Sequence, residues 1–169
     1  GAMRLLSQFD RSDVHVVVYG MGDGHDLMGL NARPNPIGGT DFIVQQGDEL
    51  VGLARLRVPG KHNGQNALAA IAAGMAADVC FDDMRTALAQ FGGMARRFQI
   101  ISTANRVAVI DDYAHHPTEI RATLAAAREQ YVGRRIWAVW QPHTFSRTEL
   151  LLNDFAVSFA DADRVVVLD

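Results

Sequence analysis

The stretch from Val107 to Glu119 constrains the fold more than any other part of this sequence. It begins with four apolar residues, Val107 to Ile110, a run typical of a strand that is covered on both faces. Pro117 suits the first position of a helix, and Glu119 supplies the negative charge that a helix favours at its start. Because open α/β sheets bind ligands at the carboxyl ends of their strands, we expect a ligand site between this strand and this helix.

The segment between the strand and the helix holds two carboxylates, a phenol and two imidazoles: Asp111, Asp112, Tyr113, His115 and His116. A single aspartate in such a place most often caps the helix that follows. Five groups exceed what one cap needs, which favours a ligand site. Adjacent histidines in an extended segment point in opposite directions, so one metal ion bound by both is disfavoured.

A second polar loop follows the strand predicted over Arg135–Trp140 and contains His143 and Arg147. Because the strands of a βαβ unit lie side by side, we expect both residues to face the same crevice as His115. Arg147 suits a carboxylate, which it can bind through a bidentate fork. The alternative is a solvated arginine beside a helix cap near Thr148.

The hydrophobic pattern of the whole chain predicts an α/β protein in two parts, with the boundary after Arg97. Before it, hairpin strands mix with helices; after it, strands and helices alternate, which predicts a partial Rossmann-like parallel sheet with flanking helices. Strands are predicted over residues 14–19, 26–33, 40–46, 50–58, 98–102, 106–110, 135–140 and 164–168, and helices over 61–75, 82–90, 117–131 and 148–160. The apolar spacing of Leu68, Ile71, Ala72 and Met75 indicates the first helix and its inward face, and Met84, Leu88 and Phe91 are expected to face inward on the second.

Composition excludes several classes of protein. The net charge of −3 gives no excess of positive charge for non-specific nucleic-acid binding. No apolar run approaches the roughly 20 residues of a membrane span. The single cysteine, Cys80, fits a reducing cytoplasm. We expect residues 1–3 to be a cloning remnant. We also expect both ends of the chain to be truncated within a domain. Exposed strands would then allow a homodimer or a strand-swapped assembly to form.

Two weaker signals lie near the start of the first predicted helix and after the second. The pair Arg96 and Arg97, placed next to a nucleotide, can hold a γ-phosphate and stabilise the charge that is transferred; a solvated surface is the alternative. His62 and Asn66 are four residues apart and therefore share one helix face. They can border an adenine, although an asparagine at a helix start is more often a cap.

Four motifs in the same order resemble the Mur ligase family across roughly residues 50–169. They are Val58–Ala70, which has the pattern P-G-x-H-N-x-x-N-A-L-A-A, then Arg96–Phe98, Asp111–Glu119 and Gln141–Thr148. The resemblance implies that residues 4–97 are the C-terminal part of a central ATP-binding domain. It also implies that residues 98–169 are the first part of a Rossmann-like C-terminal domain.

The resemblance further implies an ATP-dependent, ADP-forming amide ligase of peptidoglycan synthesis that joins L-alanine to UDP-N-acetylmuramate. ATP would phosphorylate a carboxylate, the amine of L-alanine would attack the acyl phosphate, and magnesium would neutralise the phosphates. The residues implied at ATP are His62, Asn66, Arg96, Arg97 and Asp112. Those implied around the amino acid are Tyr113, His115, His143 and Arg147. Arg97 and His115 are the implied catalytic residues, and no residue is assigned to a metal.

The chain also departs from the family pattern. It has no phosphate loop and no UDP-sugar domain, Thr144 stands where many members have arginine, and Ala95 stands where glycine is common. We therefore expect a fragment that is inactive as a ligase on its own. Two alternatives are a non-catalytic module that binds a nucleotide or an amino acid, and a metal hydrolase. The hydrolase would use His115, His116, His143 and Asp112, whose spacing does not match H-E-x-x-H.

Overall fold

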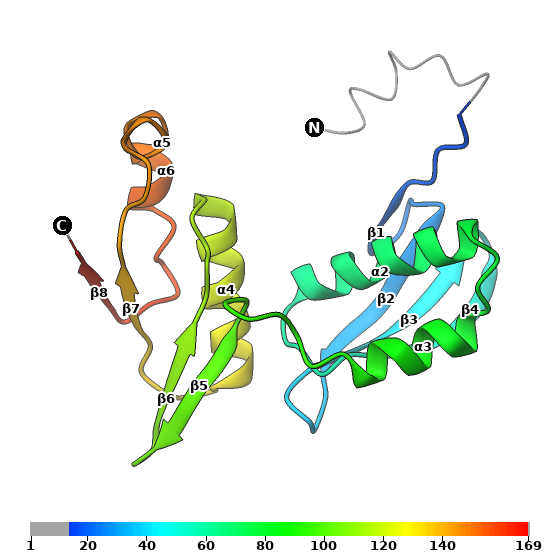
Figure 1. Ribbon diagram of the computed structural model, residues 1–169, viewed down its shortest axis with the longest axis horizontal. Helices are drawn as coiled ribbons and strands as arrows, with labels where there is room; N and C mark the ends of the chain where they lie inside the picture. Colours follow the sequence, from blue (N-terminus) through cyan, green and yellow to red (C-terminus); the bar gives the residue numbers. More distant parts are fainter. Residues whose placement is uncertain (1–13, 169) are drawn as a thin grey trace.

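The computed structural model describes residues 14–168, in two parts joined by a linker between Gln90 and Gln99 (Figure 1). The expectation that residues 1–3 are a cloning remnant lies outside the described residues. Within residues 14–168, no helix is both long enough and apolar enough to cross a membrane. The mixed α/β class predicted from the sequence is confirmed.

The first part contains a four-stranded sheet in the order β1 (Tyr19–Met21), β2 (Leu27–Pro34), β3 (Thr40–Gln46) and β4 (Glu49–Arg55). β1 and β2 are parallel, and the other neighbours are antiparallel, which confirms the hairpin predicted between β3 and β4. The strand predicted from Val14 begins only at Tyr19. The N–H of Val18 donates to the carboxylate of Asp26 at 2.8 Å instead of to a neighbouring strand.

Two helices, α2 (Lys61–Ala76) and α3 (Phe81–Gln90), pack on this sheet (Figure 1). The core between them contains Leu27, Phe42, Val44, Ala54, Leu56, Ala67, Leu68, Ile71 and Met84. The inward positions predicted for α2 are confirmed, but the prediction for Phe91 is wrong, because that ring is 46% exposed. α3 ends at Gln90, and Phe91 has the extended backbone of a C-cap, so its side chain leaves the helix face.

The second part contains the remaining elements: β5 (Gln99–Ala104), β6 (Val107–Asp111), α4 (Pro117–Gln130), β7 (Trp137–Trp140), α5 (Phe145–Leu150), α6 (Leu152–Ala156) and β8 (Arg164–Val167). β7 and β8 pair in parallel, as the alternation of strand and helix predicts. The single helix predicted over 148–160 is instead two short helices that meet at Leu151.

The prediction of one parallel sheet in this part is wrong for β5 and β6, which form an antiparallel hairpin. Its turn residues, Asn105 and Arg106, have φ values of 50° and 64°, which suit the type I′ turn that joins closely paired strands. The sequence does not reveal this hairpin because the turn lacks glycine. Within residues 14–168, no ladder joins β6 to β7, so the strands of this part do not form one continuous sheet.

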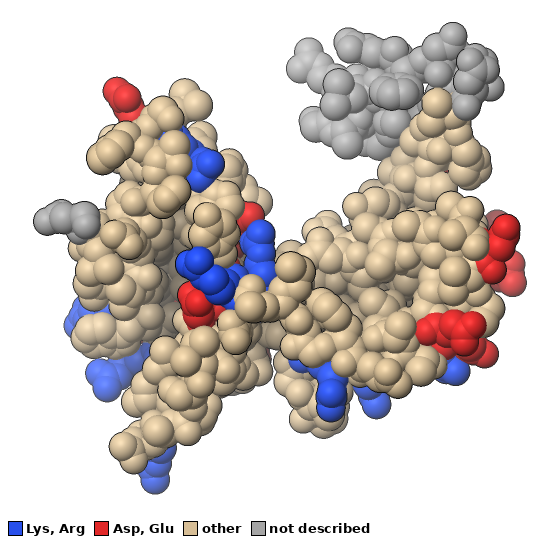
Figure 2. Space-filling view, in the orientation of Figure 1, with Lys and Arg blue, Asp and Glu red and all other residues tan. Residues whose placement is uncertain are grey.

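The strand β6 is covered on one face only, although its apolar run predicted cover on both. Ile110 packs against the cluster that includes Ala126 and Ala127 of α4. On the other face, Val107 and Val109 are exposed. Figure 2 shows the hairpin of β5 and β6 with few charges except at its tip. A sheet face rich in apolar side chains is therefore open to solvent.

Candidate functional site

The start of α4 is fixed by a capping box. His116 is the N-cap, and its Nδ1 accepts a hydrogen bond from the N–H of Thr118 at 3.2 Å. The carboxylate of Glu119 accepts from the N–H groups of His115 at 3.0 Å and His116 at 3.2 Å. Pro117 occupies the first turn, as predicted. Because His116 and Glu119 form the cap, neither Asp111 nor Asp112 is needed for it.

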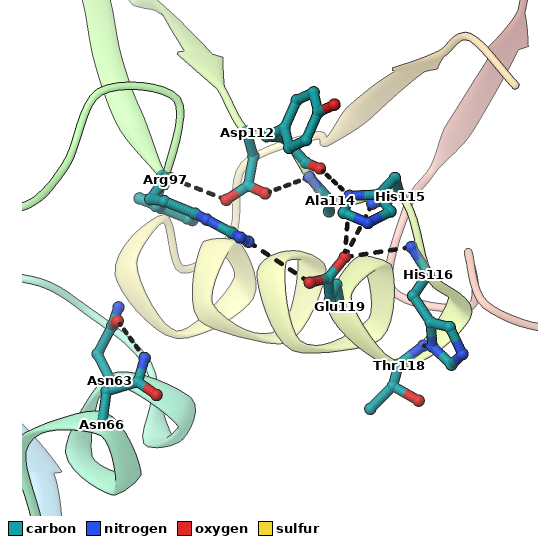
Figure 3. A network of polar contacts seen from close by, with 11 residues as sticks. Asn63, Asn66, Arg97, Asp112, Ala114, His115, His116, Thr118 and Glu119 are labelled. Carbon is teal, nitrogen blue, oxygen red and sulfur yellow. Dashed lines mark hydrogen bonds and ion pairs between the residues drawn. The ribbon is translucent and has the colours of Figure 1, made fainter. Parts of the chain in front are cut away.

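Asp112 instead ties the linker to the loop that follows β6. Its Oδ2 accepts from the N–H of Phe98 at 2.8 Å, and its Oδ1 accepts from the N–H of Ala114 at 2.7 Å (Figure 3). A carboxylate has about four lone-pair positions, so these two bonds leave acceptor capacity for ligand hydroxyls. Asp112 can therefore hold the loop and still face a ligand.

The neighbouring residues Arg96 and Arg97 have different partners. The guanidinium carbon of Arg96 lies 4.7 Å from the centroid of the Tyr113 ring, and its Nε lies 3.5 Å from the carboxylate of Asp111. The Nη1 of Arg97 lies 3.5 Å from Oε1 of Glu119 (Figure 3). Arg96 and Phe98 both have left-handed backbones, with φ of 59° and 49°, on either side of Arg97. The backbone of the linker thus directs the side chains of these two adjacent arginines toward different partners.

His62 lies at the start of α2, half-buried where α2 approaches α4. Burial lowers the pKa of His62 from its ordinary value. The charges of Asp112 and Glu129 raise this pKa, and the charge of Arg97 lowers it further. Although His62 is in the first part of the chain, it therefore lies within electrostatic reach of Arg97 and Asp112. Three of the residues that the resemblance places at ATP meet at this junction.

Asn66, the other residue predicted at the adenine, is exposed on α2 beside Asn63 (Figure 3). Its amide nitrogen lies 3.4 Å from Oδ1 of Asn63, whose own amide donates to the carbonyl of Pro59 at 2.7 Å. Neither asparagine is the N-cap of α2, because that residue is Gly60. The side chain of Asn66 is thus available at the same end of α2 as His62.

A cavity of about 910 Å³ lies between β6, β7 and α4, and the loop that carries Asp112 forms part of its lining. Its polar wall includes Tyr113 and His115 from the loop after β6, and His143 from the loop after β7. The rings of Tyr113 and His115 are 5.0 Å apart between centroids, and Nδ1 of His115 lies 2.9 Å from the Tyr113 carbonyl oxygen. Leu124 and Trp140 contribute apolar walls.

The structure thus brings His115 and His143 to one cavity, together with Arg96. Arg147 is not among the residues that line it; it lies in α5, one turn after Thr144. The helix cap predicted near Thr148 is wrong, because the N-cap of α5 is Thr144 and the Thr148 hydroxyl donates to the Thr144 carbonyl. Thr144 has φ of 76°, a strained value for a β-branched residue.

Within residues 14–168, no group of three or more His, Cys, Asp or Glu side chains is arranged to hold a metal ion. The residues that the hydrolase hypothesis requires point to other partners. Nδ1 of His116 accepts from the Thr118 N–H, and both oxygens of Asp112 accept from main-chain N–H groups. The described part of the chain therefore offers no ligand set for that hypothesis.

Glu119 belongs to this site through its contacts with Arg97 and His115, although the sequence pattern predicts it only as a residue of the helix start. Burial raises the pKa of its carboxyl group, but the N–H of His115 and the charges of His115 and Arg97 lower that pKa more. The net direction is downward, so Glu119 is ionised at neutral pH. The spacing of His116 and Glu119, which is that of a capping box, was the available signal.

Known proteins resemble this chain in both sequence and structure. Residues 96–169 match the family model described as Mur ligase, glutamate ligase domain. The UDP-N-acetylmuramate–L-alanine ligase of Symbiobacterium thermophilum is 47% identical over 154 residues, which cover 91% of this chain and 32% of that protein. The ligase of the same name from Koribacter versatilis is 46% identical over 159 residues, which cover 91% of this chain and 34% of that protein.

Among solved structures, the UDP-N-acetylmuramate-alanine ligase of Thermotoga maritima matches with a TM-score of 0.77 at 31% identity. The match covers 89% of this chain and 33% of that one. The chain thus spans about a third of the length of the curated relatives it matches. The capped start of α4 and the polar segment before it lie inside the matched segment. Residues 96–169 therefore match the glutamate ligase domain of the Mur ligase family, and 91% of the chain is similar in sequence to a UDP-N-acetylmuramate–L-alanine ligase.

Proposed function

We propose that this chain forms part of the active site of an ATP-dependent, ADP-forming ligase that joins L-alanine to UDP-N-acetylmuramate in peptidoglycan synthesis. The observation that carries the proposal is that one short segment, Asp112 to His115, borders two different environments. On one side lie His62 and Arg97, and on the other lies the cavity with Tyr113 and His143. A reaction that brings a nucleotide to an amino acid needs such a shared wall.

On the nucleotide side, His62 and Asn66 would border the adenine, and Asp112 would accept from the ribose hydroxyls. Burial keeps His62 neutral near pH 7, which suits a ring that packs against or hydrogen-bonds a base. Arg97 would contact the γ-phosphate and stabilise the charge that develops as phosphate is transferred. Arg96 would contribute less to ATP, because its partners are Asp111 and Tyr113.

On the amino-acid side, Tyr113, His115 and His143 would surround L-alanine at the polar end of the cavity. His115 is held by the Tyr113 carbonyl and by the carboxylate of Glu119, 3.5 Å from its Nδ1, so its ring is oriented before a ligand arrives. Arg147 would bind the carboxylate of the amino acid, which requires α5 to approach the cavity. The amine would attack the carbonyl carbon of an acyl phosphate and expel phosphate. Phosphate is a far better leaving group than the oxide ion that an unactivated carboxylate would have to expel.

Magnesium would accompany ATP, but the described residues supply no three-ligand group for it, so no step here depends on this chain holding the ion. We place the reaction in the cytoplasm, where ATP is available and the lone Cys80 stays reduced. We assign residues 4–97 to the ATP-binding domain and residues 98–169 to the C-terminal domain. The 169 residues alone should lack ligase activity, because their sequence contains no phosphate loop.

A segment exchange tests the proposal. Residues 14–168 replace the matching segment of the Symbiobacterium thermophilum relative, and ADP release is measured with UDP-N-acetylmuramate, ATP, magnesium and each of several amino acids. We expect ADP release that depends on L-alanine, and loss of at least about a hundredfold with Arg97→Met, as for removal of a charge-stabilising group. Arg85→Met, an arginine on α3 away from the site, is the matched control.

A chimera that folds and binds ATP but releases no ADP would instead support a non-catalytic binding module. Preference for an amino acid other than L-alanine would overturn the assignment of the substrate. Ligase turnover by the isolated 169 residues would contradict the statement that further segments are required.

A further inference from the structure

Glu119 has more polar partners than its capping role requires. Its Oε2 accepts from the N–H groups of His115 and His116, and these two bonds fix the carboxylate at the start of α4. The same oxygen lies 3.5 Å from Nδ1 of His115. The other oxygen, Oε1, takes no part in the cap and lies 3.5 Å from Nη1 of Arg97 (Figure 3).

Within residues 14–168, Glu119 is the only acidic side chain that lies within 4 Å of the Arg97 guanidinium. Asp112 is close to the linker, but both of its oxygens accept from main-chain N–H groups. The contact between Arg97 and Glu119 is a single one, and the side chains are 50% and 35% exposed. Solvent screens such a pair, which makes it weak enough to be replaced.

We propose that Glu119 is an exchangeable counter-ion for Arg97, which it holds in the free protein and gives up to a phosphate group. The inference rests on the proposed function, in which Arg97 contacts the γ-phosphate of ATP. A phosphate presents three acceptor oxygens and more charge than a carboxylate, and a guanidinium has five N–H donors in a planar fork. The phosphate therefore forms the stronger pair and displaces Oε1.

The cap explains why this exchange leaves the site intact. Oε2 keeps its bonds to the N–H groups of His115 and His116 when Oε1 loses Arg97. The start of α4 and the ring of His115 therefore stay in place while the guanidinium changes partner. Glu119 acts through Arg97, which makes it a positioning residue.

Glu119→Gln separates the two roles, because the amide oxygen of glutamine still accepts from both N–H groups while the charge is lost. The matched control is Glu129→Gln, which removes the same charge from α4 at a residue whose field reaches His62. The first measurement uses the 169-residue chain without ligand. We expect relaxation of the Nε–Hε NMR signal of Arg97 to show that its side chain is mobile in Glu119→Gln and ordered in Glu129→Gln.

The second measurement is calorimetric titration of the same chain with inorganic tripolyphosphate. We expect Glu119→Gln to bind it about two- to five-fold more tightly than the unchanged chain, the worth of one screened ion pair. The gain should disappear in an Arg97→Met background, and Glu129→Gln should show a smaller gain that does not depend on Arg97.

An equal gain with and without Arg97 would overturn the proposal, because the effect would then be a general change of charge. Weaker binding by Glu119→Gln, no binding of tripolyphosphate by any variant, or an Arg97 signal that stays ordered in Glu119→Gln would each overturn it as well. Binding of tripolyphosphate without binding of ATP would count against the proposed nucleotide site and leave the exchange standing.

Discussion

The guanidinium carbon of Arg96 lies 4.7 Å from the centre of the Tyr113 ring, and the Arg96 carbonyl accepts from the Tyr113 N–H at 2.8 Å. Side chain and main chain thus both join the linker to the loop after β6. The N–H of Phe98 adds a bond to Asp112. Residues 96–98 are therefore held by the second part of the chain, and any change of angle between the two parts should occur before Arg96.

Tyr113→Ala should lower the free energy of unfolding by about 0.5–1 kcal/mol, the usual worth of an exposed cation–π contact. Tyr113→Phe keeps the ring and should remain close to the unchanged chain. Urea unfolding followed by fluorescence measures both. Equal losses for the two substitutions would show that the hydroxyl, and not the stacked ring, carries the effect.

Asp41→Asn should destabilise the first part by about 1–3 kcal/mol, the range for losing hydrogen bonds to a charged group. Asp41 is buried and accepts from Nε and Nη2 of Arg55 at 2.9 and 2.8 Å, and from the Asn35 amide at 2.9 Å. Asp48→Asn, in the exposed turn between β3 and β4, is the control in urea unfolding. A loss no larger than that of the control would mean that the network adds nothing to stability.

The stability of the chain should fall as the pH is lowered from 7 to 5, in part because of His62. Its pKa is about 6.5 when unfolded and lower when folded, so the unfolded state binds the extra proton first. The stability from this residue is complete above pH 6.5 and declines below it. In urea unfolding at each pH, His62→Asn should flatten this decline. An unchanged slope in His62→Asn would contradict the lowered pKa.

Gly60→Ala should destabilise the junction between the two parts by about 1–3 kcal/mol. Gly60 has φ of 92°, and an added Cβ would lie 2.8 Å from the His62 ring and 3.0 Å from Cβ of Ala126 in α4. Gly92→Ala is the matched control, since that position has open space around it. Thermal unfolding measures the loss of stability. Chemical shifts of α4 residues report whether the packing between α2 and α4 has changed. Tolerance of alanine at position 60 would show that the two helices can separate there freely.

The isolated chain should self-associate through the exposed apolar residues of the two small sheets in its second part. Val109 is exposed in the sheet of β5 and β6, and Trp137, Val139 and Val166 are exposed in the sheet of β7 and β8. Exposed strands and apolar sheet faces tend to pair. Light scattering should show a dimer or larger species at high concentration, and Val139→Lys should shift it toward monomer. Val79→Lys, at an exposed valine outside these two sheets, should have no such effect. A clean monomer of the unchanged chain would refute the expectation.

The sequence by itself determined much of the local structure. Periodic apolar residues located α2 and its inward face, and the alternation around Ala54 and Leu56 located a half-exposed strand. Pro117 and Glu119 located the start of α4, since capping depends only on residues within one turn. The motifs that carry the family resemblance are also local, which is why four short segments were enough to identify it.

Only the tertiary structure decided which groups meet. The hairpin of β5 and β6 depends on left-handed backbones at Asn105 and Arg106, which no residue type there demands. The divergence of Arg96 and Arg97 depends on hydrogen bonds to Asp112 and Tyr113, residues more than ten positions away. Local patterns fix backbone preference over a few residues, whereas the partner of a long flexible side chain depends on how distant segments pack.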